Sequence, residues 1–482
     1  MSKTEKYELV VGLEVHAQLQ TNSKLFCGDH ADFSGMPNTH VSAITLAHPG
    51  TLPKINSKAI ELAVKLGTAL GCTIDTHHYF ARKNYFYPDL PKGYQISQHT
   101  HPICKKGFVY ITMPSGNKQI QLNRMHLEED AGKSLHELDE KYTSIDYNRA
   151  GVPLLEIVTE AVMHSSEEAF AFLTELRKLL RWLDVCDGNM EEGSMRCDAN
   201  ISIRLKGESK LGNRVEVKNL NSIRNVKKAI EIEKARLIEL IENNLPVIQE
   251  TRSFDADNQT TFSLRSKENS DDYRYFPDPD LPMFVISDEY LASIKESMPI
   301  LPDDLKEKYM ADYHLSLYDA TQLTIDKETV QFFEKMLQET NHIKAIANWI
   351  TGPIKYYCNE NKLSLTDFPL SCHAIASLID LTETGQVNFS NASAKILLTM
   401  ISAPNASAID TAKVLNLLQE KDQDALEQWI NEVIEMLPEK VKEFQSGKKG
   451  LIGLFLGEIK KRSKGKADME SANRILLEKL NI

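Results

Sequence analysis

The chain of 482 residues has no run of about 18 or more apolar residues, which a helix would need to cross a bilayer. Residues 1–6 contain neither the apolar core of a signal peptide nor an arginine-rich transit sequence. The seven cysteines are scattered and form no Cys-x-x-Cys pair, which argues against a disulfide framework and a zinc-binding cysteine motif. We therefore expect a cytoplasmic protein with no membrane contact.

The sequence also lacks the nucleotide-binding loops G-x-x-x-x-G-K-[ST] and G-x-G-x-x-G, and the hydrolase motifs H-E-x-x-H and G-x-S-x-G. Any nucleotide chemistry must therefore use another arrangement of residues. The net charge of −12 argues against a general coat of nucleic acid but is compatible with a local basic patch. A chain of this length is too long for one hydrophobic core and predicts two or three domains.

A segment near the N-terminus alternates between apolar and polar side chains over residues 13–19, which predicts a strand. Glu14, His16 and Gln18 share its polar face. A glutamate and a histidine two residues apart point the same way, which suits a shared ligand or a proton-transfer partner. A polar sheet face exposed to solvent explains the same pattern.

Three adjacent carboxylates, Glu128, Glu129 and Asp130, end a second predicted strand. They repel one another and cannot all be buried without a compensating cation, so we expect them to lie in water or to hold a metal. Hard carboxylate oxygens favour Mg²⁺. Glu128 and Glu129 point to opposite faces of a regular strand, so one site can use both only where a bulge or the strand end redirects one of them.

Two further segments contain side chains that require an explanation. Glu156 interrupts an otherwise apolar strand over residues 154–158, which requires a partner, an edge position or a ligand role. Residues 80–95 combine many aromatic side chains with basic ones, which suits a binding loop where rings stack and cations meet phosphate. An irregular loop held to the core by its aromatic side chains explains that segment equally well.

Turn residues between alternating segments predict two β-hairpins, one over 107–128 and one joining 199–204 to 214–218. The polar faces of the second hairpin carry Arg204 and Lys218, which suit solvent or phosphate. Beyond about residue 300 glycine becomes sparse and helical periodicity dominates. We therefore predict an α+β domain, an all-α body and a small all-α tail, with the domains at 1–292, 293–405 and 406–482.

The predicted tail contains a cluster of basic residues in an otherwise acidic protein. In such a protein the cluster indicates contact with a phosphate backbone. Lysines on a solvated helix face are the alternative explanation. The candidate tRNA-binding residues are Lys448, Lys449, Lys460, Lys461, Lys464 and Lys466.

Six groups of motifs, in chain order, resemble the B subunit of the three-subunit glutamyl/aspartyl-tRNA amidotransferase, the GatB family. They span nearly all of the first 280 residues. Residues 447–468 are similar to the YqeY-like module that ends this subunit, with Glu458 in place of the module's usual glutamine. The groups are 12–16 with 23–24, 82–89, 126–133, 192–200, 216–222 and 272–277.

The resemblance implies an antiparallel-sheet cradle of the glutamine-synthetase type, followed by the helical body and the YqeY-like tail. It implies a bacterial enzyme subunit that uses ATP and Mg²⁺ to phosphorylate the side-chain carboxylate of Glu-tRNA(Gln) or Asp-tRNA(Asn). Ammonia from the amidase partner, the A subunit, would then displace the phosphate, and a small C subunit would complete the heterotrimer. Such chemistry needs mainly positioning and charge neutralisation.

The resemblance also implies roles for individual residues. Glu14, His16, Glu128, Glu129 and Glu156 would line the metal site and the exit of the ammonia tunnel. Many family members have a cysteine-rich zinc site at the segment equivalent to 38–50. That segment contains no cysteine here, so we expect no structural zinc and packing of the loop in its place. The candidates for phosphate or acceptor-end contacts are Lys83, Arg204, Lys218 and Arg274.

Two other functional classes fit parts of the sequence. A tRNA-binding or assembly subunit without catalysis is disfavoured by the clustered acids, because carboxylates would repel RNA phosphates. A stand-alone Mg²⁺-dependent ATP hydrolase is disfavoured by the basic tail and by the missing nucleotide motifs. The catalytic amidotransferase subunit is therefore our leading hypothesis.

Overall fold

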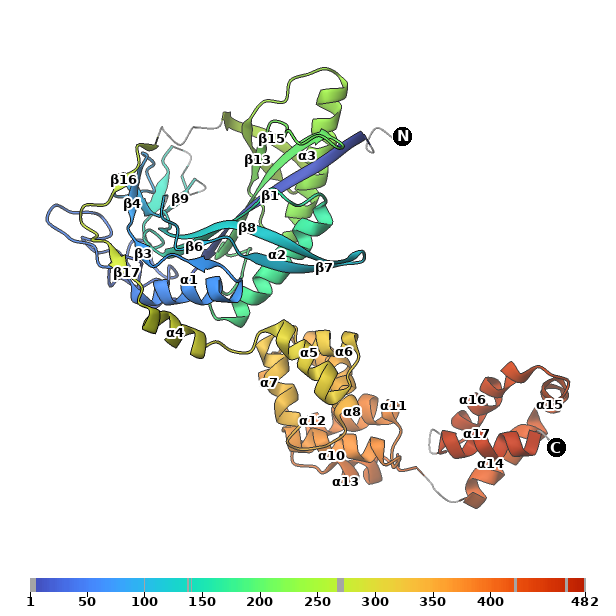
Figure 1. The fold of residues 1–482 in the computed structure, drawn as a ribbon. Helices are drawn as coiled ribbons and strands as arrows, with labels where there is room; N and C mark the ends of the chain where they lie inside the picture. Colours follow the sequence, from blue (N-terminus) through green and yellow to red (C-terminus); the bar gives the residue numbers. More distant parts are fainter. Residues whose placement is uncertain are drawn as a thin grey trace. The chain divides into compact units, whose positions relative to one another are not determined.

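The computed structural model describes residues 6–98, 100–136, 138–139, 141–266, 273–419, 423–463 and 467–480. The chain forms two compact units, Met1–Leu301 and Pro302–Ile482 (Figure 1). The first unit has mixed α and β structure and the second is helical, so the α+β class and the helical C-terminal region are confirmed. The boundary lies near the expected one, and the division of the helical part into two domains stays a prediction.

The first unit is built on a 13-stranded sheet. Its central strand is β1 (Tyr7–Gln18), which lies between β11 (Pro153–Thr159) and β12 (Met195–Leu205). On the far side of β11 lies β8 (Gly116–Glu129). The other strands of this sheet are β2 (Thr73–Ile74), β4 (Ala81–Asn84), β5 (Tyr94–Ser97), β6 (Cys104–Lys105), β7 (Phe108–Met113), β13 (Val215–Lys218), β14 (Glu250–Asp255), β15 (Thr260–Ser266) and β16 (Phe276–Pro277).

The sheet is mixed, whereas the resemblance implies an antiparallel one. Strands β13 and β14 pair in parallel, and the other strand pairs of the described residues are antiparallel. The helix α3 (Ile223–Glu242) connects β13 to β14, and such a crossover is what parallel neighbours require. Two small sheets pair β9 (Lys133–Leu135) with β10 (Ser144–Asp146) and β3 (His77–His78) with β17 (Phe284–Val285).

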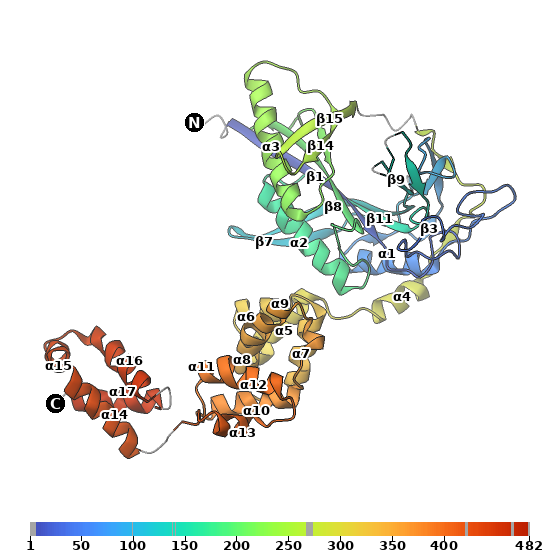
Figure 2. The same cartoon turned by 180° about the vertical axis from the view of Figure 1, so that it is seen from behind.

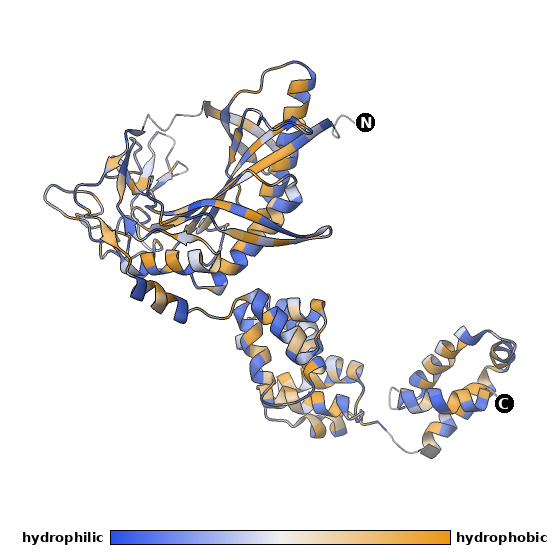
Figure 3. Ribbon diagram, in the orientation of Figure 1, coloured by the Kyte–Doolittle hydropathy of each residue, from blue (hydrophilic) through white to orange (hydrophobic). Residues whose placement is uncertain are grey.

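Three helices pack against strands of this sheet. They are α1 (Ser57–Ala69) on β8, α2 (Ser166–Trp182) on β7 and α3 on β12 (Figures 1 and 2). Ser165 caps the start of α2 and Ser222 that of α3 with their side-chain oxygens. Apolar and polar residues alternate along the strands (Figure 3). The apolar side chains of β1 are buried, and its polar residues line the opposite face.

The second unit consists of helices, several of them short. A π-helical turn at Ile350–Ile354 joins α8 to α9 and contains Pro353, which cannot donate a helical hydrogen bond. No described helix of the chain is long and apolar enough to cross a membrane. The helices of this unit are α5 (Pro302–Tyr313), α6 (Leu317–Leu323), α7 (Lys327–Met336), α8 (Ile343–Trp349), α9 (Lys355–Asn361), α10 (Cys372–Glu383), α11 (Phe389–Asn391), α12 (Leu397–Ser402), α13 (Ala408–Val414), α14 (Gln423–Met436), α15 (Pro438–Gln445), α16 (Ile452–Arg462) and α17 (Met469–Leu480).

The last four helices, α14–α17, bury a hydrophobic cluster of their own. Phe444 of α15 and Phe455 of α16 meet edge to face, with ring centroids 6.2 Å apart. Each of these side chains is almost completely buried. A separate core of this kind supports, but does not by itself establish, the expected small tail domain.

Side-chain hydrogen bonds stabilise the loop 38–50, which is equivalent to the zinc-site segment of many family members. The buried Lys24 Nζ donates to the carbonyl oxygen of His40 at 2.6 Å. Asp29 Oδ2 accepts from the backbone N–H of Ser42 at 2.8 Å and from the Thr45 hydroxyl at 2.5 Å. These bonds attach residues 40–45 of the loop to Lys24 and Asp29. That the chain needs no structural zinc stays a prediction.

Candidate active site

Strand pairing brings acidic and histidine side chains together on the polar face of the sheet. His16 on β1 is paired with Glu156 on β11, and Glu156 with His126 on β8. On the other side of β1, Glu14 is paired with Asp198 of β12. Side chains directly opposite each other in a sheet point to the same face. We define the acidic cluster as Glu14, His16, His126, Glu128, Glu156 and Asp198.

The ligand atoms of this cluster are close to one another. His16 Nε2 lies 3.7 Å from Glu14 Oε1, 3.6 Å from Glu128 Oε1 and 3.5 Å from Glu156 Oε2. His126 Nε2 lies 3.6 Å from a carboxylate oxygen of Glu128 and of Glu156. These separations exceed ordinary hydrogen bonds and are comparable to the ligand–ligand spacing around one divalent ion with bonds of about 2.1 Å.

The donor atoms form two overlapping groups, each with all members within 4.8 Å of one another. One comprises Glu14, His16 and Asp198, and the other comprises His16, Glu128 and Glu156. His16 therefore belongs to both groups. Carboxylate oxygens and imidazole nitrogens are suitable ligands for a divalent cation, so the donor set fits a metal such as Mg²⁺ or Mn²⁺.

Burial makes the charge of the cluster costly. Glu128 and Glu156 are only 5% and 8% exposed. Burial lowers the pKa of His16, but the Glu156 carboxylate 3.5 Å away and the charges of Glu128 and Glu14 outweigh this and raise the pKa to about 9. Protonated His16 thus supplies positive charge when no ion is bound, and a metal ligated by His16 would displace that proton.

The pKa values of the neighbouring Glu14 and Glu156 shift in opposite directions. Burial and the charge of Glu156 raise the pKa of Glu14. Burial opposes ionisation of Glu156 as well, but His126, His16 and Arg124 hold the pKa of Glu156 well below its usual range. Arg124 Nη2 lies 3.6 Å from Glu156 Oε1. The buried Nδ1 of His126 has no hydrogen-bond partner among the described residues. The carboxylates of the cluster are therefore only partly neutralised by neighbouring cations, which favours a bound one.

Glu129 and Asp130 are not members of this cluster and have protein cations as partners. Lys92 Nζ lies 2.5 Å from Glu129 Oε2, and the backbone N–H of Ile96 donates to the other oxygen. Arg196 Nη2 donates to Asp130 Oδ2 at 2.9 Å. The expectation that the three adjacent acids lie in water or hold a metal is therefore wrong for these two, because protein cations compensate their burial.

Two of the four predicted phosphate-binding cations are ion-paired near the centre of the sheet. Arg204 Nε donates to Glu8 Oε2 at 2.6 Å. Lys218 pairs with Asp198 and so lies directly beside the acidic cluster. Lys218 is therefore the better placed of the two for contact with a ligand held by the cluster.

The other two predicted cations belong to the aromatic segments of the first unit. Lys83 Nζ lies 4.8 Å from the ring centroid of Tyr273 and 5.6 Å from that of Tyr85, a cation–π arrangement. Arg274 is exposed and adopts a left-handed backbone with φ 46°. The rings of Tyr85 and Tyr87 pack edge to face, as the explanation of a loop held by its aromatic side chains requires, and a binding role of residues 80–95 stays a prediction.

The tail lysines lie on exposed helix ends or outside the described residues. Lys464 and Lys466 are among those that the structure does not describe. Lys460 and Lys461 lie in the last turn of α16, where a cation also stabilises the helix itself. Lys448 forms an ion pair of 3.0 Å with an acidic side chain of α15. Contact of these lysines with tRNA stays a prediction.

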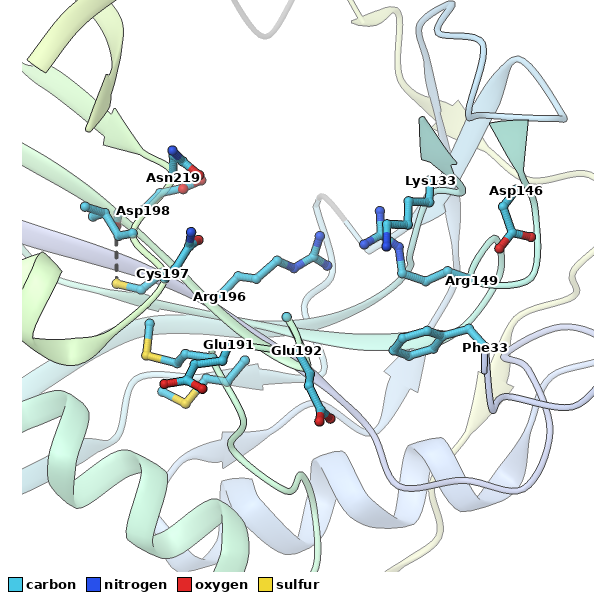
Figure 4. A pocket seen from close by; sticks show the side chains of 15 residues that line it. Phe33, Lys133, Asp146, Arg149, Glu191, Glu192, Arg196, Cys197, Asp198 and Asn219 are labelled. Carbon is cyan, nitrogen blue, oxygen red and sulfur yellow. Dashed lines mark hydrogen bonds between the residues drawn. The ribbon is translucent and has the colours of Figure 1, made fainter. Parts of the chain in front are cut away.

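A pocket of about 450 Å³ adjoins the acidic cluster and shares Asp198 with it (Figure 4). Its wall includes part of β12, the loop 190–193 and the segment 219–221 that precedes α3. Lys133, Arg149 and Arg196 contribute positive charge to the wall. Figure 4 shows Arg196 pointing towards Lys133 and Arg149, whereas Glu192 points in another direction.

Sequence reasoning missed several of these residues. His126 is two residues before Glu128 and Asp198 is two before Asn200, so strand alternation could have assigned both to the polar face. By the same alternation Arg196, two residues before Asp198, belongs to the polar face. Arg149 carried no such signal, because it lies outside the strands.

Most of this chain matches domains of one known family. Residues 9–292 match the model of the GatB/GatE catalytic domain, and residues 331–480 match that of the GatB domain. The chain belongs to the GatB family. The acidic cluster of this GatB-family chain and its pocket both lie within the matched catalytic domain.

Curated relatives resemble this GatB-family chain over nearly its whole length. The B subunit of the aspartyl/glutamyl-tRNA(Asn/Gln) amidotransferase of Chlorobaculum tepidum is 44% identical over 98% of each chain. The protein with the same name from Oleidesulfovibrio alaskensis is 44% identical over 98% of this chain and 99% of its own. That of Thermodesulfovibrio yellowstonii is 44% identical over 98% of each chain.

Proposed function

We propose that this chain is the catalytic B subunit of an ATP-dependent amidotransferase that acts on Glu-tRNA(Gln), Asp-tRNA(Asn) or both. The observation that carries the proposal is the buried acidic cluster, whose two ligand groups share His16. It lies in the segment that matches the GatB/GatE catalytic domain. Buried carboxylates with few neighbouring cations are typical of sites that bind metal and phosphate.

The proposed reaction has two steps. The side-chain carboxylate of the tRNA-bound amino acid attacks the γ-phosphorus of ATP, which forms an acyl phosphate and releases ADP. Ammonia then attacks the acyl carbon, inorganic phosphate leaves with the electrons of the C–O bond, and loss of a proton from nitrogen leaves the amide. The attacking carboxylate is already ionised at neutral pH, so the first step needs positioning rather than a general base.

The acidic cluster would serve the first step. Mg²⁺ bound there would neutralise charge on the transferred phosphoryl group. Glu14, His16, Glu128 and Glu156 would hold the ion, and Asp198 would extend the ligand set towards the pocket. Glu129 could join them only after release from Lys92, so we assign it to orienting the end of β8.

The remaining partners follow from the names of the relatives and from the tail. A protein named as a B subunit acts within a larger assembly, which supports an amidase partner as the ammonia source and a small third subunit. The basic residues of α16 support contact of the tail with tRNA. The glutamine-synthetase-like origin of the cradle and a bacterial cytoplasmic location are part of the same proposal.

Amidation of Glu-tRNA(Gln) tests the proposal directly. The full chain would be assayed with its amidase partner, ATP, Mg²⁺ and glutamine, beside Glu14→Ala, Glu128→Ala and the exposed Glu208→Ala as a matched control. We expect product from wild type and Glu208→Ala and none from the two cluster variants. Equal product from all four would mean that the cluster is structural and that this chain mainly presents tRNA.

A further inference from the structure

Strand β15 forms one edge of the sheet in the first unit. It lies beyond β14 in the strand order, and the helix α3 packs against it (Figure 2). The side chain of Thr261 points towards this helix, because its hydroxyl donates a hydrogen bond to Glu233 of α3. Successive side chains of a strand alternate between its two faces. Phe262 therefore points to the face of the sheet that is opposite α3.

The strand register connects Phe262 with the acidic cluster across the sheet. Phe262 is opposite Ser253 of β14, and Ser253 is opposite Lys218 of β13. Lys218 is ion-paired with Asp198 of β12, which is opposite Glu14 of β1. Side chains that are opposite each other share a face, so Phe262 lies on the face of the cluster. Four strand spacings of about 4.8 Å each place Phe262 about 19 Å from Glu14.

The chemistry of this sheet face changes between the cluster and its edge. The face is acidic at the cluster and then polar at Lys218, Ser253 and Thr251, whose hydroxyl donates to Glu216 at 2.9 Å. At the edge it becomes apolar, because the side chain of Phe262 is 50% exposed. An exposed aromatic ring on a polar sheet face is typical of surfaces on which nucleic-acid bases stack.

The position of Phe262 at an edge favours one kind of ligand. Phe262 does not line the pocket beside the acidic cluster, and a small molecule would preferentially occupy such a concave site. A polymer can continue beyond the open edge of the sheet, and the outer edge of β15 offers backbone groups for hydrogen bonds. A protein partner usually requires a larger apolar patch than the exposed Phe262 and Leu264 provide.

We propose that Phe262 is a stacking platform for a base of the single-stranded 3′ end of the tRNA substrate, with Leu264 as its apolar border. The inference rests on the proposed function, which places the side-chain carboxylate of the aminoacyl group at the acidic cluster. The ester-linked amino acid and its ribose cover only part of the distance from Glu14 to Phe262. The bases of the single-stranded end are therefore the groups that reach the ring.

Binding of two tRNA probes to the full chain tests this platform. The probes are a tRNA(Gln) transcript and the same transcript without its single-stranded 3′ end. Phe262→Ala removes the ring, and Phe170→Ala removes a partly exposed ring of α2 as a matched control. We expect the Kd of the intact transcript to rise about tenfold in Phe262→Ala alone, a typical effect of losing one base–aromatic stack. The Kd of the truncated transcript should stay at its wild-type value.

Two further variants distinguish stacking from a structural role of the ring. Phe262→Tyr keeps an aromatic face and should retain the wild-type affinity for both transcripts. Leu264→Ala should weaken the intact transcript by about threefold or less, because it leaves the ring in place. In the amidation assay Phe262→Ala should raise the KM for Glu-tRNA(Gln) and leave kcat within about twofold, since the ring is distant from the reacting atoms.

The outcomes separate this inference from its alternatives. Unchanged affinity of Phe262→Ala for the intact transcript, or an equal loss for both transcripts, would overturn the platform. Weaker ATP binding or loss of the amidase partner, with tRNA affinity retained, would overturn it in favour of a nucleotide or a protein surface. A loss confined to the intact transcript, in a chain whose complex supports no amidation, would leave the platform standing and overturn only the proposed function.

Discussion

The two units of the chain differ in how many charged side chains they bury. Among the residues of the first unit that the structure describes, eight acidic or lysine side chains are buried, namely Lys24, Glu128, Glu129, Asp130, Glu156, Glu216, Glu233 and Asp278. Among the described residues of the second unit, only Asp319 is. Burying a charge costs free energy unless partners compensate it. The first unit therefore gives up stability at positions where the helical unit does not.

Burial alone does not distinguish a functional acid from a structural one. Glu233 on α3 is completely buried, yet Arg236 and Arg252 pair with its carboxylate, at 2.8 Å and 3.3 Å. Asp319 pairs with Lys344 and also accepts a hydrogen bond from the hydroxyl of Ser316, the residue that caps the start of α6. The acidic cluster differs because several carboxylates share few cations. The difference between the units is therefore a local excess of negative charge on one sheet face.

The largest expected effect is that of removing the negative charge of Glu128 from the acidic cluster. Glu128→Gln keeps the size and hydrogen-bonding capacity of the side chain but removes a charge and a metal ligand. We expect ATP-dependent amide formation to fall by about a hundredfold or more, with tRNA affinity within about twofold of wild type. Single-turnover amidation and filter binding measure the two quantities. A rate equal to wild type would remove the metal role of Glu128.

Removing residues 406–482 tests whether the tail of the helical unit binds tRNA. We expect tRNA affinity to fall by about tenfold or more at low salt, because several cations that would neutralise phosphates are lost. ATP turnover per bound tRNA should stay near wild type, since the acidic cluster lies in the first unit. Titrations at two salt concentrations are the measurement, and the salt dependence should become shallower. Equal affinity with and without these residues would contradict a tRNA-binding role of the tail.

A cavity in the tail core should have a smaller and strictly local effect. Phe455→Ala removes a ring packed against Phe444 and should cost about 3–5 kcal/mol in the unfolding of α14–α17. The unfolding of the first unit and its affinity for ATP should not change. Calorimetry would resolve the two transitions. A matched shift of both transitions would show that the units unfold as one.

The smallest expected effect concerns His78, a buried polar group outside the acidic cluster. Burial lowers the pKa of His78, and its ring lies 4.9 Å from that of Phe284. Because the folded state resists protonation, the unfolded state binds more protons once the pH falls below about 6.5, and stability decreases with decreasing pH. His78→Phe should weaken this acid sensitivity, measured as unfolding free energy at pH 7 and 5.5. The exposed His48→Phe should not.

Local structure was the part that the sequence predicted well. The first hairpin appears as β7 and β8, and the second as β12 and β13. These features depend on neighbours within a few residues. Strand β14 was not predicted, so its parallel pairing with β13 could not be predicted either.

The site could be predicted only in part for the same reason. Alternation alone placed Glu14 and His16 on one face, and the resemblance added Glu128 and Glu156. The pairing of β1 with β11 joins segments more than a hundred residues apart, and that of β11 with β8 joins segments some thirty residues apart. The periodicity of the sequence does not indicate which strands pair. The partners of Glu129 and Asp130 also come from distant segments, so their neutralisation by protein cations was missed.

The register of β1 has a consequence for how this gene can change. Each residue of β1 contributes to either the polar face or the apolar core, so a slip by one position would present Leu13 and Val15 where Glu14 and His16 now lie. An insertion or deletion of one residue within Tyr7–Gln18 should therefore abolish both folding and activity. The hairpin turn after Met113 lies at the opposite end of β8 from Glu128 and should accept length changes freely. The central strand can thus vary by substitution but not in length.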